Sequence, residues 1–189
     1  ETILWNGDFN INIVIKAKGI SLLTFNPNDN KIAIIDLPDQ IYLESSHGFG
    51  NWQLGSIYGL GESQKNLGGG KLLRDTLKNL LGLPIDGLLD FSGKYAEKKP
   101  QDILSEIRKS PFSVISFMSY LKTNLTPYEL IKLNLKFSSV RFDKVKQIHL
   151  EQVPDLLEAN VLPDGTGILV VDTIKLDSIL SGMVDMILR

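Results

Sequence analysis

The sequence predicts an α/β fold of the α+β layered kind, in which helices flank a central mixed β-sheet. Runs with a period of two and many β-branched residues indicate strands, and runs with a helical period are interleaved with them. These elements form no regular βαβ repeat, which favours a layered sheet over a bundle or a barrel. The chain has 189 residues without an internal repeat or a long linker. We therefore expect one domain that spans residues 1–189.

The first 36 residues are predicted to form an antiparallel sheet. Ile11, Ile13 and Ile15 alternate with polar residues, as in a strand that buries one face. Residues 26–30 have turn chemistry and join two β-rich runs into a hairpin. The strands predicted in this part are residues 2–5, 11–15, 20–25 and 31–36.

The pattern then changes from strands to a glycine-rich segment and a helix. Residues 45–70 contain eight of the 16 glycines and few apolar residues. This composition predicts a long, irregular surface loop of the kind that often carries function. From Gly70 onward the leucines follow a helical stripe that stops at Gly82 and Pro84. We therefore expect a helix that packs one face on the core.

The second half of the chain contains more helices. Thr126, Pro127 and Glu129 have the spacing of a helix start in which two side chains satisfy free backbone amides. Asp172 is expected to cap the last helix. We predict strands at residues 85–91, 145–150 and 167–171, the last two separated by a turn at 163–165, and helices at 102–109, 111–122, 126–137 and after 172.

The composition excludes several classes of function. With 20 basic and 22 acidic residues the net charge is −2, which argues against a nucleic-acid binder whose affinity rests on neutralising phosphates. The absence of cysteine removes thiol nucleophiles and thiolate metal sites, and two distant histidines, His47 and His149, cannot form a multi-histidine metal site. Few side chains could clamp a phosphate with two hydrogen bonds, because this geometry is typical of arginine. The chain has four arginines, Arg74, Arg108, Arg141 and Arg189.

The start of the sequence and its lack of cysteine lead us to expect a trimmed protein that functions outside the cytoplasm. No apolar run is long enough to span a membrane, and the first residue is Glu1 rather than Met. We expect that an upstream segment, an anchor or a signal, has been removed, and that this segment provides the membrane association. The lack of cysteine is typical of extracytoplasmic bacterial proteins, although many cytosolic proteins also lack it.

The candidate chemical groups also have ordinary structural interpretations. Residues 68–70, three glycines before a helix, can cradle an anion, but a flexible helix entry is the favoured interpretation. His47 is interpreted as a solvated loop histidine and His149 as a packed or edge histidine. Asp36 and Asp39 are either a carboxylate pair or turn and cap residues, with the second favoured.

Four segments in order carry a resemblance to a known family. The paired runs 20–27 and 31–38 end in Asp-Leu-Pro, where the family has Ser-Ile-Pro-Arg-Asp-Thr, and residues 53–59 are similar to its Lys-Ile-Asn-x-Ala-Tyr segment. Residues 69–86, a Gly-Gly pair, a long helix and Gly-Leu-Pro-Ile-Asp, are the most specific match, and residues 123–126 resemble its closing portion. On these segments the chain resembles the LytR-CpsA-Psr proteins of bacterial cell envelopes.

The resemblance implies a fold and a reaction. Proteins of this family are anchored by an N-terminal membrane span and transfer glycopolymers from a polyprenyl pyrophosphate carrier onto peptidoglycan. They use Mg²⁺, aspartates and arginines around the pyrophosphate. In this chain Asp8 corresponds to the first metal-binding aspartate, whereas Lys18 stands at the position of the second.

The chain departs from the family at further chemical positions. Asp39 and Gln40 stand where the Arg-Asp of the proline motif belongs, and Gln53 and Gly55 replace the Lys and Asn of the later motif. The family's arginine-rich segment is reduced here to Arg108. A lysine at a metal position places a cation where the ion belongs, and each lost clamp costs ~2.7–4 kcal/mol of transition-state stabilisation.

Three hypotheses follow from this comparison. The first is a non-catalytic domain without a cofactor that binds a polyprenyl-phosphate lipid or an envelope glycopolymer. The second is an active transferase with Mg²⁺ and a rearranged site, in which Lys18 supplies charge together with Lys71 or Arg74. The third is an unrelated soluble regulatory domain that shares only the order of strands and helices. The candidate ligand-binding residues are Asp8, Lys18, Asp39, Gln40, Gln53, Lys71 and Arg74.

Overall fold

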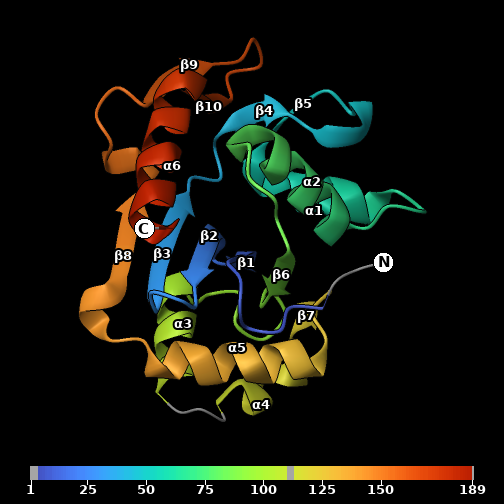
Figure 1. Cartoon of the computed structure of the whole chain (residues 1–189). Coiled ribbons are helices and arrows are strands. Elements are labelled where there is room, and N and C mark those ends of the chain that lie inside the picture. The colour runs from blue at the N-terminus through green and yellow to red at the C-terminus, as the bar shows by residue number, and fades with distance from the viewer. Residues whose placement is uncertain (1–3, 110–112, 189) are drawn as a thin grey trace.

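The computed structural model describes residues 4–109 and 113–188, and its centre is a mixed six-stranded sheet. The strand order is β7-β6-β1-β2-β3-β8 (Figure 1). β1, β2 and β3 form an antiparallel meander, β6 is parallel to β1, and β8 is parallel to β3. The strands are β1 Ile11–Ala17, β2 Gly19–Asn26, β3 Lys31–Leu37, β6 Gly87–Asp90, β7 Lys122–Thr123 and β8 Val145–His149. The predicted fold class is confirmed.

Helices cover both faces of this sheet. One face packs against α1, α2 and α6, and the other packs against α3, α4 and α5. The expectation that residues 11–15 bury only one face is therefore wrong, since Ile13 and Val14 point to opposite faces and both are 0% exposed. The helices are α1 Leu54–Ser63, α2 Gly69–Leu81, α3 Pro100–Arg108, α4 Ser113–Met118, α5 Pro127–Ser139 and α6 Thr173–Leu188.

Local sequence signals account for several helix ends. α2 ends at Gly82, which has a left-handed φ of 63° and whose amide donates to the Lys78 carbonyl. α5 begins with the predicted capping box between Thr126 and Glu129. Asp172 caps α6, because its Oδ1 accepts hydrogen bonds from the amides of residues 174 and 175. These three predictions are confirmed.

The prediction of an irregular loop over residues 45–70 is wrong. This segment contains the turn η1 Ser46–Gly48, the strand β5 Asn51–Gln53, which pairs with β4 Tyr42–Glu44, and the whole of α1. The glycines allow two helices to approach each other. A Cβ at Gly61 would lie 2.7 Å from the Gly69 Cα, and a Cβ at Gly69 would lie 2.4 Å from the Tyr58 carbonyl oxygen. Close helix packing therefore explains the glycines at positions 61 and 69.

The C-terminal part contains a strand that the sequence pattern missed. β9 Leu157–Val161 pairs with β10 Gly167–Val171, so the turn at 163–165 joins these two strands and not β8 and β10. Short turns η2 Phe142–Lys144 and η3 Leu150–Gln152 flank β8. Residues 4 and 5 are not in a strand, and residues 2, 3, 111 and 112 of the predicted elements lie outside the described residues.

The β9–β10 hairpin is attached to the loop that follows β3. The Leu169 amide donates to the Gln40 carbonyl at 2.9 Å, and Ile41 forms a parallel bridge with Leu169. The Gln53 side-chain amide donates to the Gly167 carbonyl at 2.9 Å. The β9–β10 hairpin thus holds the loop at residues 38–41 in place.

Candidate functional site

The candidate site lies at the edge of the sheet where four parallel strands end. β1, β3, β6 and β8 run in the same direction, so their carboxyl ends meet at one edge. Lys16 of β1 pairs in register with Asp90 of β6, and Asp36 of β3 pairs with His149 of β8. Ligands of open α/β sheets bind outside the carboxyl ends of the strands. The alternation of side chains places these two pairs on opposite faces of the sheet.

The first pair, on the α1 side, joins a lysine to a buried aspartate. Lys16 Nζ lies 3.8 Å from Asp90 Oδ1 and 4.5 Å from the centre of the Tyr58 ring. The amide and the hydroxyl of Ser92 donate to the same Asp90 oxygen at 2.9 and 2.5 Å. Burial alone would raise the pKa of Asp90, but the Ser92 and Tyr58 hydrogen bonds and the Lys16 charge outweigh it, so this pKa is lowered.

Tyr58 and Asp39 complete the surroundings of Lys16. Burial, together with hydrogen bonding to the Asp90 carboxylate, raises the pKa of Tyr58, so its hydroxyl keeps its proton. Burial also raises the pKa of Asp39, and the positive charge of Lys16 opposes that rise. Asp39 lies against Gly55, whose amide donates to the Asp39 carbonyl at 3.0 Å and where a Cβ would lie 2.9 Å from the Asp39 Cβ.

The second pair, on the α3 side, is centred on the Asp36 carboxylate. The Ser21 hydroxyl donates to Oδ1 at 2.6 Å. The side-chain amides of Gln101 and Gln147 donate to Oδ2 at 2.5 and 3.0 Å, and His149 Nδ1 lies 2.7 Å from the same oxygen. Asp36 is thus held by side chains from β2, α3 and β8.

A cavity of about 300 Å³ lies beside these groups at the carboxyl-end edge. Its lining includes Lys18, Asp39 and Gln40 of the predicted set, together with Lys99 and His149. Lys18 follows β1 directly, is 60% exposed, and has Nζ 3.8 Å from Glu97 Oε2. We call this space the carboxyl-end cavity. Three of the seven predicted ligand residues meet there.

The other predicted residues lie elsewhere. Gln53 precedes α1 and bonds to the β9–β10 hairpin. Asp8 lies before β1, where its carboxylate accepts a hydrogen bond from Asn6 Nδ2 at 2.7 Å. Asp8 and Lys18 therefore lie beyond opposite ends of the seven-residue strand β1, which is ~20 Å long. The structure does not bring these two predicted metal positions together.

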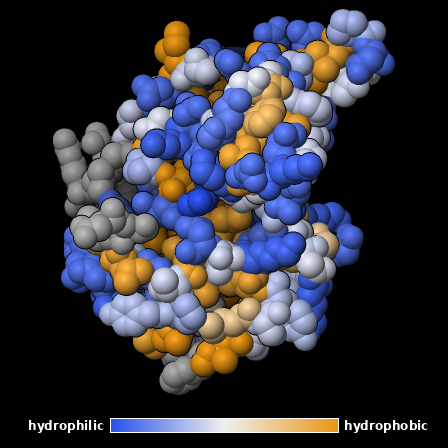
Figure 2. Space-filling model, turned by 90° about the vertical axis from the view of Figure 1, so that its right-hand side faces the viewer, coloured by the Kyte–Doolittle hydropathy of each residue, from blue (hydrophilic) through white to orange (hydrophobic). Residues whose placement is uncertain are grey.

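Arg74 of α2 lines a different and larger cavity, of about 890 Å³, near the amino end of β1. This cavity also contains Trp5, Phe9 and Asp86. Figure 2 shows the corresponding side of the molecule, where apolar atoms are exposed in a recess among hydrophilic surface. Burial raises the pKa of Asp86, and the hydrogen bond from the Asn12 amide opposes that rise.

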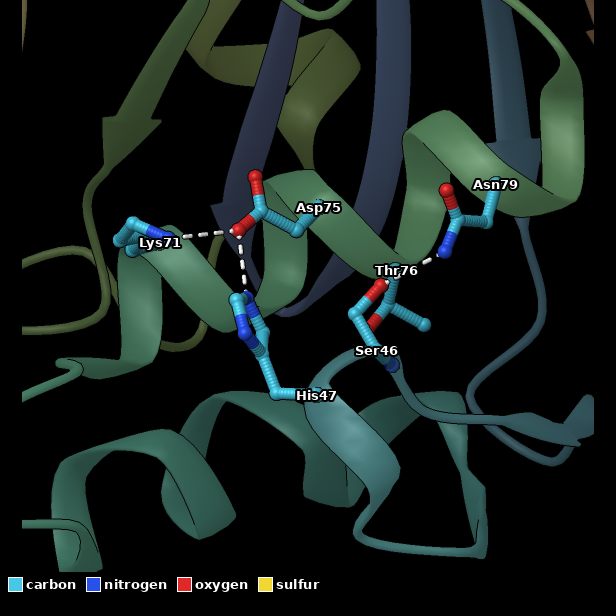
Figure 3. A network of polar contacts seen from close by, with 6 residues as sticks. All are labelled: Ser46, His47, Lys71, Asp75, Thr76 and Asn79. Carbon is cyan, nitrogen blue, oxygen red and sulfur yellow. Dashed lines mark hydrogen bonds and ion pairs between the residues drawn. The ribbon is translucent and has the colours of Figure 1, made fainter.

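Lys71 belongs to a polar network between α2 and η1 (Figure 3). Its Nζ lies 2.9 Å from Asp75 Oδ2, and His47 Nε2 lies 2.7 Å from the same oxygen. Ser46 connects η1 to α2 through hydrogen bonds with Thr76 and Asn79. His47, interpreted from the sequence as a solvated loop residue, is partly exposed but has a carboxylate partner 28 residues away.

At the carboxyl-end edge, the carboxylates of Asp36 and Asp90 contact the protein's own groups, and Asp90 Oδ2 is buried without a hydrogen-bond partner among the described residues. Within residues 4–109 and 113–188, no group of three or more acidic or histidine side chains is placed to hold a metal ion. Asp90 faces the Lys16 ammonium, which supplies the positive charge itself. The same part of the chain contains no helix that is both long and apolar enough to cross a bilayer.

Sequence patterns missed Lys16, Asp90 and the Asp36–His149 pair. The available signal was a polar residue at the end of an otherwise apolar strand, which occurs at Lys16, Asp36 and Asp90. Such a residue marks a strand end but does not reveal its partner. The interpretation of His149 as an edge histidine is confirmed, since β8 is an outer strand of the sheet.

Comparison with known proteins gives matches in structure only. No family model and no curated protein sequence matches the chain. The LytR-CPS2A-psr family protein YwtF (TagT), solved with bound octaprenyl pyrophosphate lipid, matches with a TM-score of 0.68 and 14% identity, over 98% of this chain and 93% of that chain. TagT bound to LIIa-WTA matches with a TM-score of 0.69 and 13% identity, over 97% and 92%.

A third solved structure, TagV from B. subtilis, has a TM-score of 0.67 and 12% identity, over 95% of this chain and 96% of that chain. At such identities the likeness establishes the fold and leaves individual residue roles open. The sheet and its flanking helices are those of LytR-CpsA-Psr proteins. The resemblance seen in the sequence is confirmed at the level of the fold.

Proposed function

We propose, from the fold that this chain shares with LytR-CpsA-Psr proteins, that it is a non-catalytic, extracytoplasmic binding domain of the cell envelope. Its ligand is the phosphate group of a polyprenyl-phosphate lipid or of an envelope glycopolymer, and it uses no metal cofactor. The carboxyl-end cavity takes this group. Support for the ligand class comes from the similar fold of TagT, which was solved with octaprenyl pyrophosphate.

The observation that carries this proposal is the pairing of Lys16 with Asp90. A Mg²⁺-dependent phosphotransferase needs carboxylate oxygens that are free for the metal and cations that clamp the leaving phosphate. Here the Asp90 oxygen Oδ1 already accepts two bonds from Ser92 and faces the Lys16 ammonium. Oδ1 of this carboxylate is thus occupied by the protein's own groups, whereas the buried Oδ2 is not occupied by any described residue.

The described arginines lie away from the carboxyl-end cavity. Arg108 donates to the carbonyls of Phe137 and Val140, and Arg141 pairs with Asp143 at 3.0 Å. Arg74 lines the larger cavity at the other end of β1. The cavity itself offers Lys18 and Lys99, which attract a phosphate but do not give the bidentate contacts of a guanidinium.

Native mass spectrometry of the purified chain tests the binding function. We expect a co-purifying lipid or glycolipid that contains phosphate. The variant Lys18→Ala should lower its occupancy, whereas Lys78→Ala, an exposed lysine on α2, serves as the matched control. A protein free of any such ligand, together with no binding of geranyl pyrophosphate in solution, would overturn the proposal.

A hydrolysis assay separates this function from an active transferase. The alternative is favoured by Asp39, because burial raises the pKa of this carboxyl group, which is the direction a general acid needs. Lys71 and Arg74, the other residues assigned to that site, do not line the cavity. We expect no Mg²⁺-dependent hydrolysis of geranyl pyrophosphate. Turnover that requires Mg²⁺ and is lost in Lys18→Ala would establish the alternative.

A further inference from the structure

We propose that His149 is the pH-sensitive ligand contact of the carboxyl-end cavity, and that its protonated ring donates a hydrogen bond from Nε2 to a phosphate oxygen. This inference rests on the proposed function and adds a specific residue and a form of regulation to it. The binding of a phosphate group should therefore be stronger at pH 5.5 than at pH 7.5.

The position of the ring is fixed by Asp36. His149 Nδ1 lies 2.7 Å from Asp36 Oδ2, and two acceptor atoms do not approach so closely without a proton between them. Nδ1 therefore carries the hydrogen of this contact, and Nε2 is the nitrogen left for a ligand. No described contact of His149 uses Nε2, and the side chain is 41% exposed where it lines the cavity.

Asp36 is itself held, so the ring cannot easily turn away. Ser21, Gln101 and Gln147 donate to its two oxygens from three different elements. Its side chain is only 18% exposed. A carboxylate that orients one nitrogen of a histidine and leaves the other facing a cavity is a recurrent arrangement in sites where imidazole contacts a ligand.

The cavity is lined by charges of both signs, so a phosphate bound there would depend on the charge of the His149 ring. The ionisable groups that line it besides His149 are the cations Lys18 and Lys99 and the acids Asp36, Asp39 and Glu151. Four donor groups surround the Asp36 oxygens, and burial raises the pKa of Asp39 against the opposing charge of Lys16. Neutral His149 presents a lone pair to a phosphate oxygen, whereas the imidazolium presents a hydrogen and a positive charge.

Calorimetric titration at pH 5.5, 6.5 and 7.5 tests this inference. Geranyl pyrophosphate and inorganic pyrophosphate are the two probes, since the first carries a lipid and the second only the phosphate group. For the wild-type chain we expect binding to be roughly tenfold tighter at pH 5.5 than at pH 7.5, because the imidazolium donates a hydrogen bond from Nε2 and the neutral ring does not.

Three variants separate His149 from other effects of pH. His149→Asn keeps an amide near the position of Nδ1, where it can still donate to Asp36, and removes Nε2. His149→Gln places an amide near Nε2 and should restore part of the affinity without the dependence on pH. His47→Asn is the matched control, because the chain has only two histidines. Titration of the probe itself affects all proteins equally, so the difference between His47→Asn and His149→Asn isolates His149.

The outcomes distinguish the inference from the function on which it rests. Loss of the pH dependence in His149→Asn but not in His47→Asn supports the inference, and the probe that binds identifies a lipid-linked or a free phosphate as its source. Binding with the same pH dependence in both variants overturns the inference and leaves the proposed function intact. If neither probe binds at any of these pH values, both fail. Circular dichroism confirms beforehand that each variant is folded.

Discussion

At the scale of single residues, Lys16 and Lys18 lie two positions apart but have different environments. The side chain of Lys16 is 17% exposed and faces Asp90, which is 1% exposed, whereas Lys18 is 60% exposed at the rim of the cavity. One lysine therefore balances a buried charge, and the other is available to a ligand. The difference follows from the end of the strand, because Lys16 lies within β1 and Lys18 lies beyond its last residue.

This difference predicts opposite behaviour of two alanine variants. Lys16→Ala leaves the buried Asp90 without its cation and should lower the free energy of unfolding by about 3 kcal/mol, the low end for a broken buried pair because Ser92 still donates to Asp90. Lys18→Ala should change it by less than about 0.5 kcal/mol and should weaken ligand binding instead. Urea denaturation of both variants measures the two values. Equal destabilisation would contradict the distinction.

Only part of the site could be predicted at this scale. Lys18, Asp39 and Gln40 were found because they stand at motif positions, and the structure brings these three to one cavity. Lys16 and Asp90 are 74 residues apart, and only the register between β1 and β6 makes them neighbours. A pattern of polar and apolar residues contains no such pairing information.

At the scale of elements, the helices that could be predicted from the sequence are those with a recognisable start or stop signal. α2 and α5 combine an apolar stripe with a glycine stop or a capping box. α1 was missed because its glycines have poor helix propensity, and tertiary packing overrides that propensity. β9 was missed because its side chains are mostly exposed and give no apolar alternation.

The packing of α1 on α2 makes a test of this explanation possible. Gly69→Ala should destabilise the chain by about 1–3 kcal/mol, because the new Cβ would lie 2.4 Å from the Tyr58 carbonyl oxygen. Gly59→Ala in α1 meets nothing within 4 Å and should stabilise the chain by up to about 1 kcal/mol through helix propensity. Thermal unfolding of the two variants shows whether these glycines serve helix packing or only local flexibility. If flexibility were their only role, both alanine variants would be more stable than the wild type.

At the scale of the whole molecule, carboxyl groups in separate layers link stability to pH. Hydrogen bonds from Thr126 and the Trp5 amide outweigh burial and lower the pKa of Glu129. Hydrogen bonds and charge from Lys71 and His47 likewise lower the pKa of Asp75. Ser92, Tyr58 and Lys16 lower the pKa of Asp90. A carboxyl with a lowered pKa stabilises the fold above its unfolded value, about 4, and this stabilisation is lost as the pH falls through the folded value.

We therefore predict that unfolding becomes easier as the pH falls below about 4. Asp39 and Asp86 act in the opposite direction, because burial raises their pKa values. The comparison with Glu129→Gln isolates one contribution: this variant should lose less stability than the wild type between pH 5 and pH 3. Urea midpoints measured by near- and far-ultraviolet circular dichroism provide the test, and coincident transitions would also support the single domain expected for residues 1–189. An identical pH dependence in the variant would contradict the assigned role of Glu129.

The attachment of the β9–β10 hairpin to the loop after β3 has a consequence for the order in which the site is completed. The carbonyl of Gln40 receives its hydrogen bond from Leu169, and Gln53 is bonded to Gly167. During synthesis from the N-terminus, the loop with Asp39 and Gln40 therefore emerges long before the segment that fixes it. Nascent chains that stop before residue 167 possess every lining residue of the carboxyl-end cavity. They lack the hydrogen bonds from the β9–β10 hairpin that fix the loop at residues 38–41.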